Sequence, residues 1–244
     1  MLKKACVLAL ATLLLAACQD VVFGLPERID GSGNVTSVVV DVDEFDEIAL
    51  AGIGDAEVTV GVAPSLTIET DDNLQDYLIA EVDGSTLELR VRSGYNLDTS
   101  EGVRFQIGTP SLSRVEISGA GTVTADDVAS EDFTVVLSGA GDLVFSNLDA
   151  TSLRVTISGA GKVELSGAIG FQEVTLSGMG DYEAADLESE EAVVEISGVG
   201  SGTVWVTRRL EATLSGVGSL GYWGSPEVER TISGSGAVNA LGEK

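Results

Sequence analysis

The chain has 244 residues, enough for one large domain or two small ones, and 44% of them are hydrophobic, enough for a packed core. Acidic residues outnumber basic residues by 39 to 13, so the surface would repel phosphates, which disfavours DNA or RNA as a partner. The sequence has no histidine and only two cysteines, Cys6 and Cys18. This composition excludes zinc sites of the Cys/His type and removes the commonest general base.

The N-terminus predicts export. Residues 1–17 form a short basic region followed by an apolar stretch, which is typical of a signal peptide and too short for a transmembrane helix. Leu15-Ala16-Ala17-Cys18 resembles the bacterial lipobox, which implies cleavage before Cys18 and a membrane anchor through lipid on that residue. Gln19 follows, and by resemblance to the known sorting rule it implies the outer membrane. The mature chain would hold 11 basic and 39 acidic residues, a formal charge of −28.

The mature chain divides into a tether and one domain. Residues 18–34 contain Pro26, Gly31 and Gly33 and predict a lipidated tether. From Val35 onward apolar and polar residues alternate, as they do in half-buried strands. Residues 35–244 therefore predict a single all-β domain.

An internal repeat indicates how these strands are arranged. Ser-Gly-x-Gly occurs seven times between Ser118 and Ser233, at spacings of 20, 20, 19, 20, 18 and 18 residues, and a degenerate copy occupies residues 51–54. The residue before each serine is Ile or Leu, and the residue three before it is Val except at Ala212 and Arg230. About 20 strand residues at about 3.3 Å each trace a loop of about 60 Å. We therefore expect a β-solenoid with coils of about 20 residues, regular from about residue 112.

The glycines of the repeat predict tight corners. We expect them to adopt a positive φ or to lie in a crowded corner, and a Cβ would be unfavourable in either case. We also expect the small or apolar residue between the two glycines to fold toward the core. The predicted turn glycines are Gly119, Gly121, Gly139, Gly141, Gly159, Gly161, Gly178, Gly180, Gly198, Gly200, Gly216, Gly218, Gly234 and Gly236.

Several motifs resemble a known family. Phe45-Asp46-Glu47-Ile48, Val58-Thr59-Val60-Gly61, Pro110-Ser111-Leu112 and the Ile-Ser-Gly-Ala-Gly repeats are similar to those of the putative autotransporter adhesin, head GIN domain family. The resemblance extends from about Asn34 to the C-terminus. It implies a right-handed parallel β-helix, export from a bacterial cell, often as a lipoprotein, and an adhesive role. It supplies no catalytic residues.

Three other kinds of site fit the sequence poorly. Gly-x-Gly is found in phosphate loops, but here every copy opens onto a strand and no Gly-Lys-Ser/Thr follows. Calcium-binding solenoid repeats carry Asp two residues after the last glycine, whereas Asp142 and Asp181 follow it directly and the other copies lack it. Paired carboxylates for polysaccharide cleavage would rest on fold analogy alone. We expect no cofactor and no dedicated metal site, and weak calcium binding by the acidic surface stays open.

The only two tryptophans define a candidate contact surface. Trp205 and Trp223 take the same outward position in successive coils, about 5 Å apart, and Arg208 and Arg209 lie near them in sequence. One hypothesis is a platform for a sugar ring, a peptide aromatic or a second copy of the chain. The alternative is a cover for the C-terminal end of the solenoid, which needs capping.

Three functions remain to be weighed. The first is a non-enzymatic cell-envelope lipoprotein that displays its solenoid for adhesion or binding, with a glycan or a protein as ligand. The second is a structural envelope scaffold without a specific ligand. The third is a polysaccharide-active enzyme, which the lack of histidine and of any polar cluster outside the repeat pattern disfavours.

Overall fold

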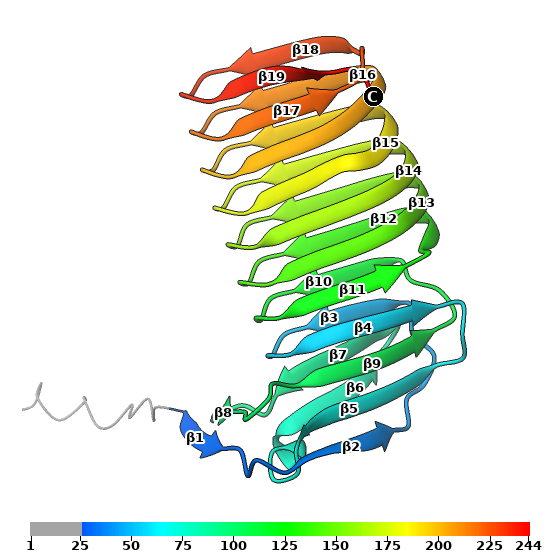
Figure 1. Cartoon of the computed structure of the whole chain (residues 1–244), viewed down its shortest axis with the longest axis vertical. Coiled ribbons are helices and arrows are strands. Elements are labelled where there is room, and N and C mark those ends of the chain that lie inside the picture. Colours follow the sequence, from blue (N-terminus) through cyan, green and yellow to red (C-terminus); the bar gives the residue numbers. More distant parts are fainter. Residues whose placement is uncertain (1–25) are drawn as a thin grey trace, which may run out of the picture.

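The computed structural model describes residues 26–244, which form a flattened β-solenoid whose coils stack along one axis (Figure 1). The N-terminal strands lie at one end of the stack, and β18 and β19 lie at the other. The prediction of an all-β solenoid with coils of about 20 residues is confirmed. The predicted signal peptide and Cys18 lie outside the described residues, so both stay predictions.

Each regular coil contains two strand segments. Each segment pairs in parallel with the equivalent segment of the next coil. The Ser-Gly-x-Gly corners lie along one edge, and a second corner turns the chain at the other edge. The register follows the repeat, because Val135 lies opposite Val155 and Val155 lies opposite Val174. The strands of this part are β10 (Arg114–Ile117), β11 (Thr122–Asp126), β12 (Ala129–Leu137), β13 (Asp142–Ile157), β14 (Lys162–Leu176), β15 (Asp181–Ile196), β16 (Ser201–Leu214), β17 (Ser219–Trp223), β18 (Glu227–Ile232) and β19 (Ala237–Gly242).

The core consists of apolar columns that run along the solenoid axis. Alternate residues of each strand point inward, so equivalent positions of successive coils stack on one another. The Ile or Leu before each serine is buried in six of the seven coils, as are the inward residues after the glycines from Val123 to Leu220. Aromatic rings fill two inward positions, where Phe133 and Phe145 pack with ring centroids 5.7 Å apart. Burial of these columns against neighbouring coils is the main stabilising term.

Of the two reasons predicted for the turn glycines, the crowded corner is confirmed and the positive φ is wrong. Of the fourteen turn glycines only Gly121 has φ in the positive range. The glycines are required because the backbones of successive coils touch at this corner. A Cβ on Gly159 would lie 2.0 Å from the carbonyl oxygen of Gly139, and a Cβ on Gly161 would lie 1.9 Å from that of Gly141. The strained φ values occur at the opposite corner instead, at Asp127 (56°), Asn147 (54°) and Gly167 (134°).

The prediction that the residue between the two glycines folds toward the core is wrong. Met179, Val199 and Val217 are 72%, 64% and 65% exposed. Their backbone amides hydrogen-bond the coil before, as when the Met179 N–H donates to the Gly159 carbonyl at 3.1 Å, and this contact leaves the side chain on the outer edge.

The first coil is interrupted by an insertion. Its strands β3 (Glu47–Leu50) and β4 (Asp55–Val60) pair in parallel with β10 and β11. The degenerate motif joins the glycine column, because the Ala120 N–H donates to the Gly52 carbonyl at 2.9 Å. Residues 61–111 then fold beneath this coil as β5 (Ser65–Asp71), the 3-10 turn η1 (Gln75–Tyr77), β6 (Leu78–Asp83), β7 (Thr86–Val91), β8 (Tyr95–Asp98) and β9 (Arg104–Thr109).

This N-terminal end departs from the expected parallel order. β7 and β9 extend the parallel stack below β3 and β4, but β2 (Val35–Val40) pairs antiparallel with β5, β5 with β9, and β6 with β7. The β6–β7 hairpin turns at Gly84-Ser85, because Asp83 pairs with Thr86, and Gly84 has a φ of 65°. A two-residue loop that begins with glycine is a usual signal for such a hairpin.

The predicted tether is partly wrong, because folded structure begins within it. β1 (Glu27–Asp30) pairs in parallel with β8. The buried carboxylate of Asp71 fastens the following segment, since it accepts hydrogen bonds from the N–H of Ser100 at 2.9 Å, the hydroxyl of Ser100 at 2.7 Å and the N–H of Gly33 at 2.7 Å. These bonds hold the pKa of Asp71 below its ordinary value.

The C-terminal coil carries a charged residue at an inward position. Arg230 of β18 lies opposite the buried Ala212, so it takes the position that valine holds in the earlier coils. Within residues 26–244, β18 and β19 are paired on one side only. Nine of the eleven basic residues in this range form ion pairs, and Arg230 does not. An inward-pointing charge on an edge strand opposes pairing with another chain.

The glycine column predicts that substitutions at two neighbouring residues have very different effects on the free energy of unfolding. Gly159→Ala should lower the free energy of unfolding by about 1–3 kcal/mol, because the new methyl group meets the backbone of the previous coil. Ala160→Val, one residue further, should change it by less than about 0.5 kcal/mol, because that side chain is exposed. Urea unfolding followed by circular dichroism measures both, and equal stabilities for the two variants would contradict the contact.

Arg230 predicts a change in oligomeric state. Arg230→Val should produce concentration-dependent self-association, because it removes the charge from the free edge of β18. Arg209→Val is the control, since Arg209 points outward and pairs with Glu229 at 3.2 Å. Sedimentation velocity measures both variants beside the unmodified chain. An Arg230→Val variant that sediments like the unmodified chain at all concentrations would show that another feature protects the edge.

Candidate functional site

The two tryptophans lie next to each other as predicted by the repeat. Trp205 of β16 pairs in register with Trp223 of β17. Both are half-buried and not fully exposed. The ammonium group of Lys244 lies 5.2 Å from the centroid of the Trp205 ring, a cation–π contact, and the Cβ position of Gly242 is 3.7 Å from the Trp223 ring. The last residues of the chain therefore cover part of this aromatic pair.

The arginines near the tryptophans are already bound to carboxylates. Arg208 reaches Glu190 at 2.7 Å and Glu191 at 2.6 Å in the preceding coil, and Arg209 reaches Glu229 in the following one. All of these groups are exposed, so each pair contributes little to stability. A ligand would have to displace the carboxylates to use the guanidinium groups, which weakens the case for a contact surface here and favours the cover.

A buried polar network, which was not predicted from the sequence, lies beneath Trp205. The hydroxyl of Tyr182 donates to the side-chain oxygen of Gln172 at 2.9 Å, the amide of Gln172 donates to Ser189 at 2.8 Å, and Ser189 donates to the carbonyl of Trp205 at 2.8 Å. Burial raises the pKa of Tyr182 far above its ordinary value, so its hydroxyl stays protonated. Every polar atom is satisfied and none faces solvent, which makes this a structural network that links three coils.

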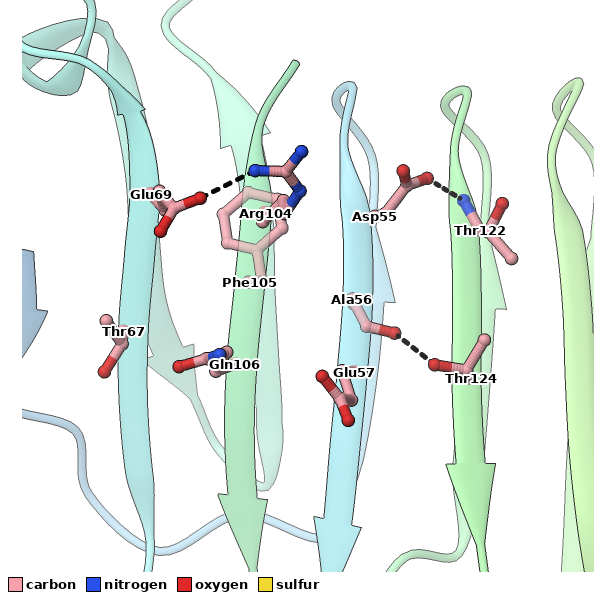
Figure 2. A pocket seen from close by; sticks show the side chains of 10 residues that line it. All are labelled: Asp55, Ala56, Glu57, Thr67, Glu69, Arg104, Phe105, Gln106, Thr122 and Thr124. Atoms are coloured by element: carbon pink, nitrogen blue, oxygen red, sulfur yellow. Dashed lines mark hydrogen bonds and ion pairs between the residues drawn. The ribbon is translucent and has the colours of Figure 1, made fainter. Parts of the chain in front are cut away.

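A groove crosses the outer face of the sheet at the junction of the insertion and the first coils (Figure 2). It has a volume of about 250 Å³. Its walls come from four adjacent strands, β5, β9, β4 and β11, which place their outward side chains side by side. The lining residues are Asp55, Ala56, Glu57, Thr67, Glu69, Arg104, Phe105, Gln106, Thr122 and Thr124.

The groove offers both hydrogen-bond donors and acceptors on a rigid base. Arg104 at its centre pairs with Glu69 at 2.6 Å, and each remains about half exposed. Gln106 follows Arg104 on the same face of β9, and Glu57 faces it from β4. This site was not predicted from the sequence, because its residues are unremarkable singly and belong to strands that only the insertion brings together.

The described residues do not assemble a metal centre or a membrane span. No group of three or more His, Cys, Asp or Glu between residues 26 and 244 is placed to hold a metal ion. No helix in the same range is long and apolar enough to cross a membrane.

The fold defines the class of protein as a parallel β-solenoid whose outer faces carry polar side chains. The sequence pattern of the family described as "putative auto-transporter adhesin, head GIN domain" matches residues 44–226. The chain belongs to this family, as its motifs indicated. The family is adhesin-like and is not an enzyme family, and it indicates an extracellular or surface location.

Solved structures share the fold. A protein from Bacteroides fragilis described as a putative adhesin is 24% identical, with a TM-score of 0.84, and the match covers 87% of this chain and 100% of that one. A protein from Parabacteroides distasonis described as a putative lipid binding protein is 25% identical, with a TM-score of 0.73 and coverage of 88% and 100%. A putative adhesin from Parabacteroides merdae is 22% identical, with a TM-score of 0.69 and coverage of 88% and 99%. No curated protein matches the chain significantly.

The covered position of the tryptophans predicts that they stabilise the last coils. Trp205→Ala should lower the free energy of unfolding by about 1–2 kcal/mol, since it removes a half-buried ring and the contact with Lys244. Arg208→Ala should cost less than about 1 kcal/mol, because its ion pairs are exposed. Urea unfolding and acrylamide quenching test this. Full quenching together with unchanged stability of Trp205→Ala would favour the contact surface instead.

Proposed function

We propose that the protein is an exported, non-enzymatic component of the cell envelope, anchored in the outer membrane by lipid on Cys18, and that it uses its solenoid to bind a ligand. Membership of an adhesin-like family supports a binding role at the surface. The lipobox-like sequence that ends at Cys18 supports the anchor. Gln19 after the cysteine supports the outer membrane.

The observation that carries the binding role is the groove across β5, β9, β4 and β11. A guanidinium group, an amide, hydroxyls and carboxylates face one hollow on a sheet that does not need to rearrange. Such a mixture of fixed donors and acceptors suits a ligand rich in hydroxyl groups. Asp55, Glu57 and Glu69 repel anions, so the ligand class we propose is a neutral glycan.

The groove lacks the features of a catalytic site. Glu69 is held by Arg104, and Asp55 accepts a hydrogen bond from the N–H of Thr122 at 2.8 Å. Glycoside cleavage needs two carboxyl groups placed on either side of one sugar bond, and the ion pair of Glu69 and the hydrogen bond of Asp55 engage both of these groups with the protein itself. Binding without turnover is therefore the function that this geometry supports best.

A glycan array tests the proposal. The chain without residues 1–18 retains every strand of the structure and should bind a subset of neutral glycans. Arg104→Ala combined with Gln106→Ala should weaken that binding by about tenfold or more, the effect of losing one to two good hydrogen bonds. Arg154→Ala is the matched control, because Arg154 also forms an exposed ion pair, with Glu173 at 2.7 Å, but in a distant coil.

Three results would count against the groove. These are binding to no glycan, equal loss in the Arg154→Ala control, or loss only when Trp205 and Trp223 are replaced. The last result would move the ligand to the tryptophan surface.

The lipid anchor is tested separately. Cys18→Ser should abolish lipid labelling, and the chain should then be released from the membrane. A chain that remains in the detergent phase after this substitution would contradict lipidation at Cys18.

A further inference from the structure

The seven Ser-Gly-x-Gly corners form an uncharged strip along one edge of the described solenoid. None of the 28 residues in the seven copies is charged, although the chain holds 52 charged residues. The middle residues stack from coil to coil and stay exposed, as the pairing of Met179, Val199 and Val217 through the preceding glycine carbonyls shows. The edge therefore forms a ridge of apolar side chains, which we call the apolar ridge: Ala120, Ala140, Ala160, Met179, Val199 and Val217.

The ridge becomes larger and less charged toward the C-terminus. Alanines occupy its first three positions, and Met179, Val199 and Val217 follow. The residue after the last glycine is Asp142, Lys162 or Asp181 in the middle coils, but serine or alanine in the last three. Net charge has the same trend, because residues 26–207 hold seven basic and 34 acidic residues whereas residues 208–244 hold four of each. Exposed apolar groups gathered on a soluble surface mark a contact with a partner.

The dimensions and the charge of the ridge argue against a protein partner. Six side chains at a spacing of about 4.8 Å extend over about 24 Å in a single row. A row of that size falls well below the roughly 800 Å² per partner of a stable protein interface. A second copy of the chain would also bring two strongly negative bodies together. A basic partner would bind the acidic faces rather than a strip without charge.

A lipid surface fits these properties. Zwitterionic headgroups neither attract nor repel an uncharged strip, and the acyl boundary accepts Met and Val side chains. Figure 1 shows that β1, where the described chain begins, lies on the same side of the solenoid as the Ser-Gly-x-Gly corners. An anchor on Cys18 would hold this edge near the bilayer, so that even a weak contact becomes occupied.

We propose that the apolar ridge rests on the membrane that holds the lipid anchor, with Met179, Val199 and Val217 inserted at its surface. The proposal rests on lipidation of Cys18. It orients the solenoid with its axis along the membrane, and it leaves the groove on an outer face of the sheet free for ligand.

An environment-sensitive dye tests the contact. In the lipidated chain the signal peptide with Cys6 is gone and Cys18 is acylated, so Val199→Cys supplies the one thiol for labelling. Thr151→Cys is the control, because Thr151 is exposed in β13 beyond the opposite corner. In phosphatidylcholine vesicles, the dye at 199 should shift to the blue and be quenched by doxyl-labelled lipid, and the dye at 151 should do neither. Met179→Glu with Val217→Glu should abolish the shift at 199.

Flotation of the same vesicles separates the two proposals. If the chain floats but the dye at 199 shows the same emission and quenching as the dye at 151, the anchor stands and the ridge proposal is overturned. If the chain does not float, the anchor and the ridge proposal both fail. A blue shift at 199 that appears without vesicles and grows with protein concentration would identify a second copy as the occupant and would also overturn the proposal.

Discussion

The stacking of one coil directly on the next is the constraint on which this structure depends. At the Ser-Gly-x-Gly corner the backbones of neighbouring coils are so close that a Cβ on Gly198 would lie 2.0 Å from the carbonyl oxygen of Gly178. The absence of side chains there lets the corner backbones hydrogen-bond from coil to coil, and each motif stacks on the motif of the preceding coil, which sets the parallel register of the strands beside it. The apolar columns stack because the register is fixed, so corner and core stabilise each other along the whole axis.

The sequence was sufficient to predict the regular part of the fold. Equal spacing of the serines, together with Ile or Leu one residue before each of them, determined the coil length and the inward column, and both agree with the structure. The sequence left the reason for the glycines open, because composition cannot distinguish a positive φ from a close approach of backbones. The exposure of Met179 and Val217 was misjudged for the same reason, since a corner residue can point to either side.

The insertion and the groove could not be predicted from the repeat. Residues 51–54 had to be stacked on residues 118–121, which lie 67 positions further along the chain, and no local pattern encodes such a pairing. The groove results from that pairing, because it places β9 between β4 and β5. The network of Gln172, Tyr182 and Ser189 was hidden as well, since each residue alone looks like a tolerated variant of an apolar or outward position.

The attachment of β1 determines how the protein would carry mechanical load. A pull on the chain ahead of Glu27 enters the fold through four residue pairs between β1 and β8, and then through the carboxylate of Asp71. Neither element belongs to the stacked coils, which are joined by far longer ladders such as that of β14 and β15. Under tension β1 would detach first and lengthen the extended segment ahead of the fold, while the stacked coils and the groove on their face kept their shape.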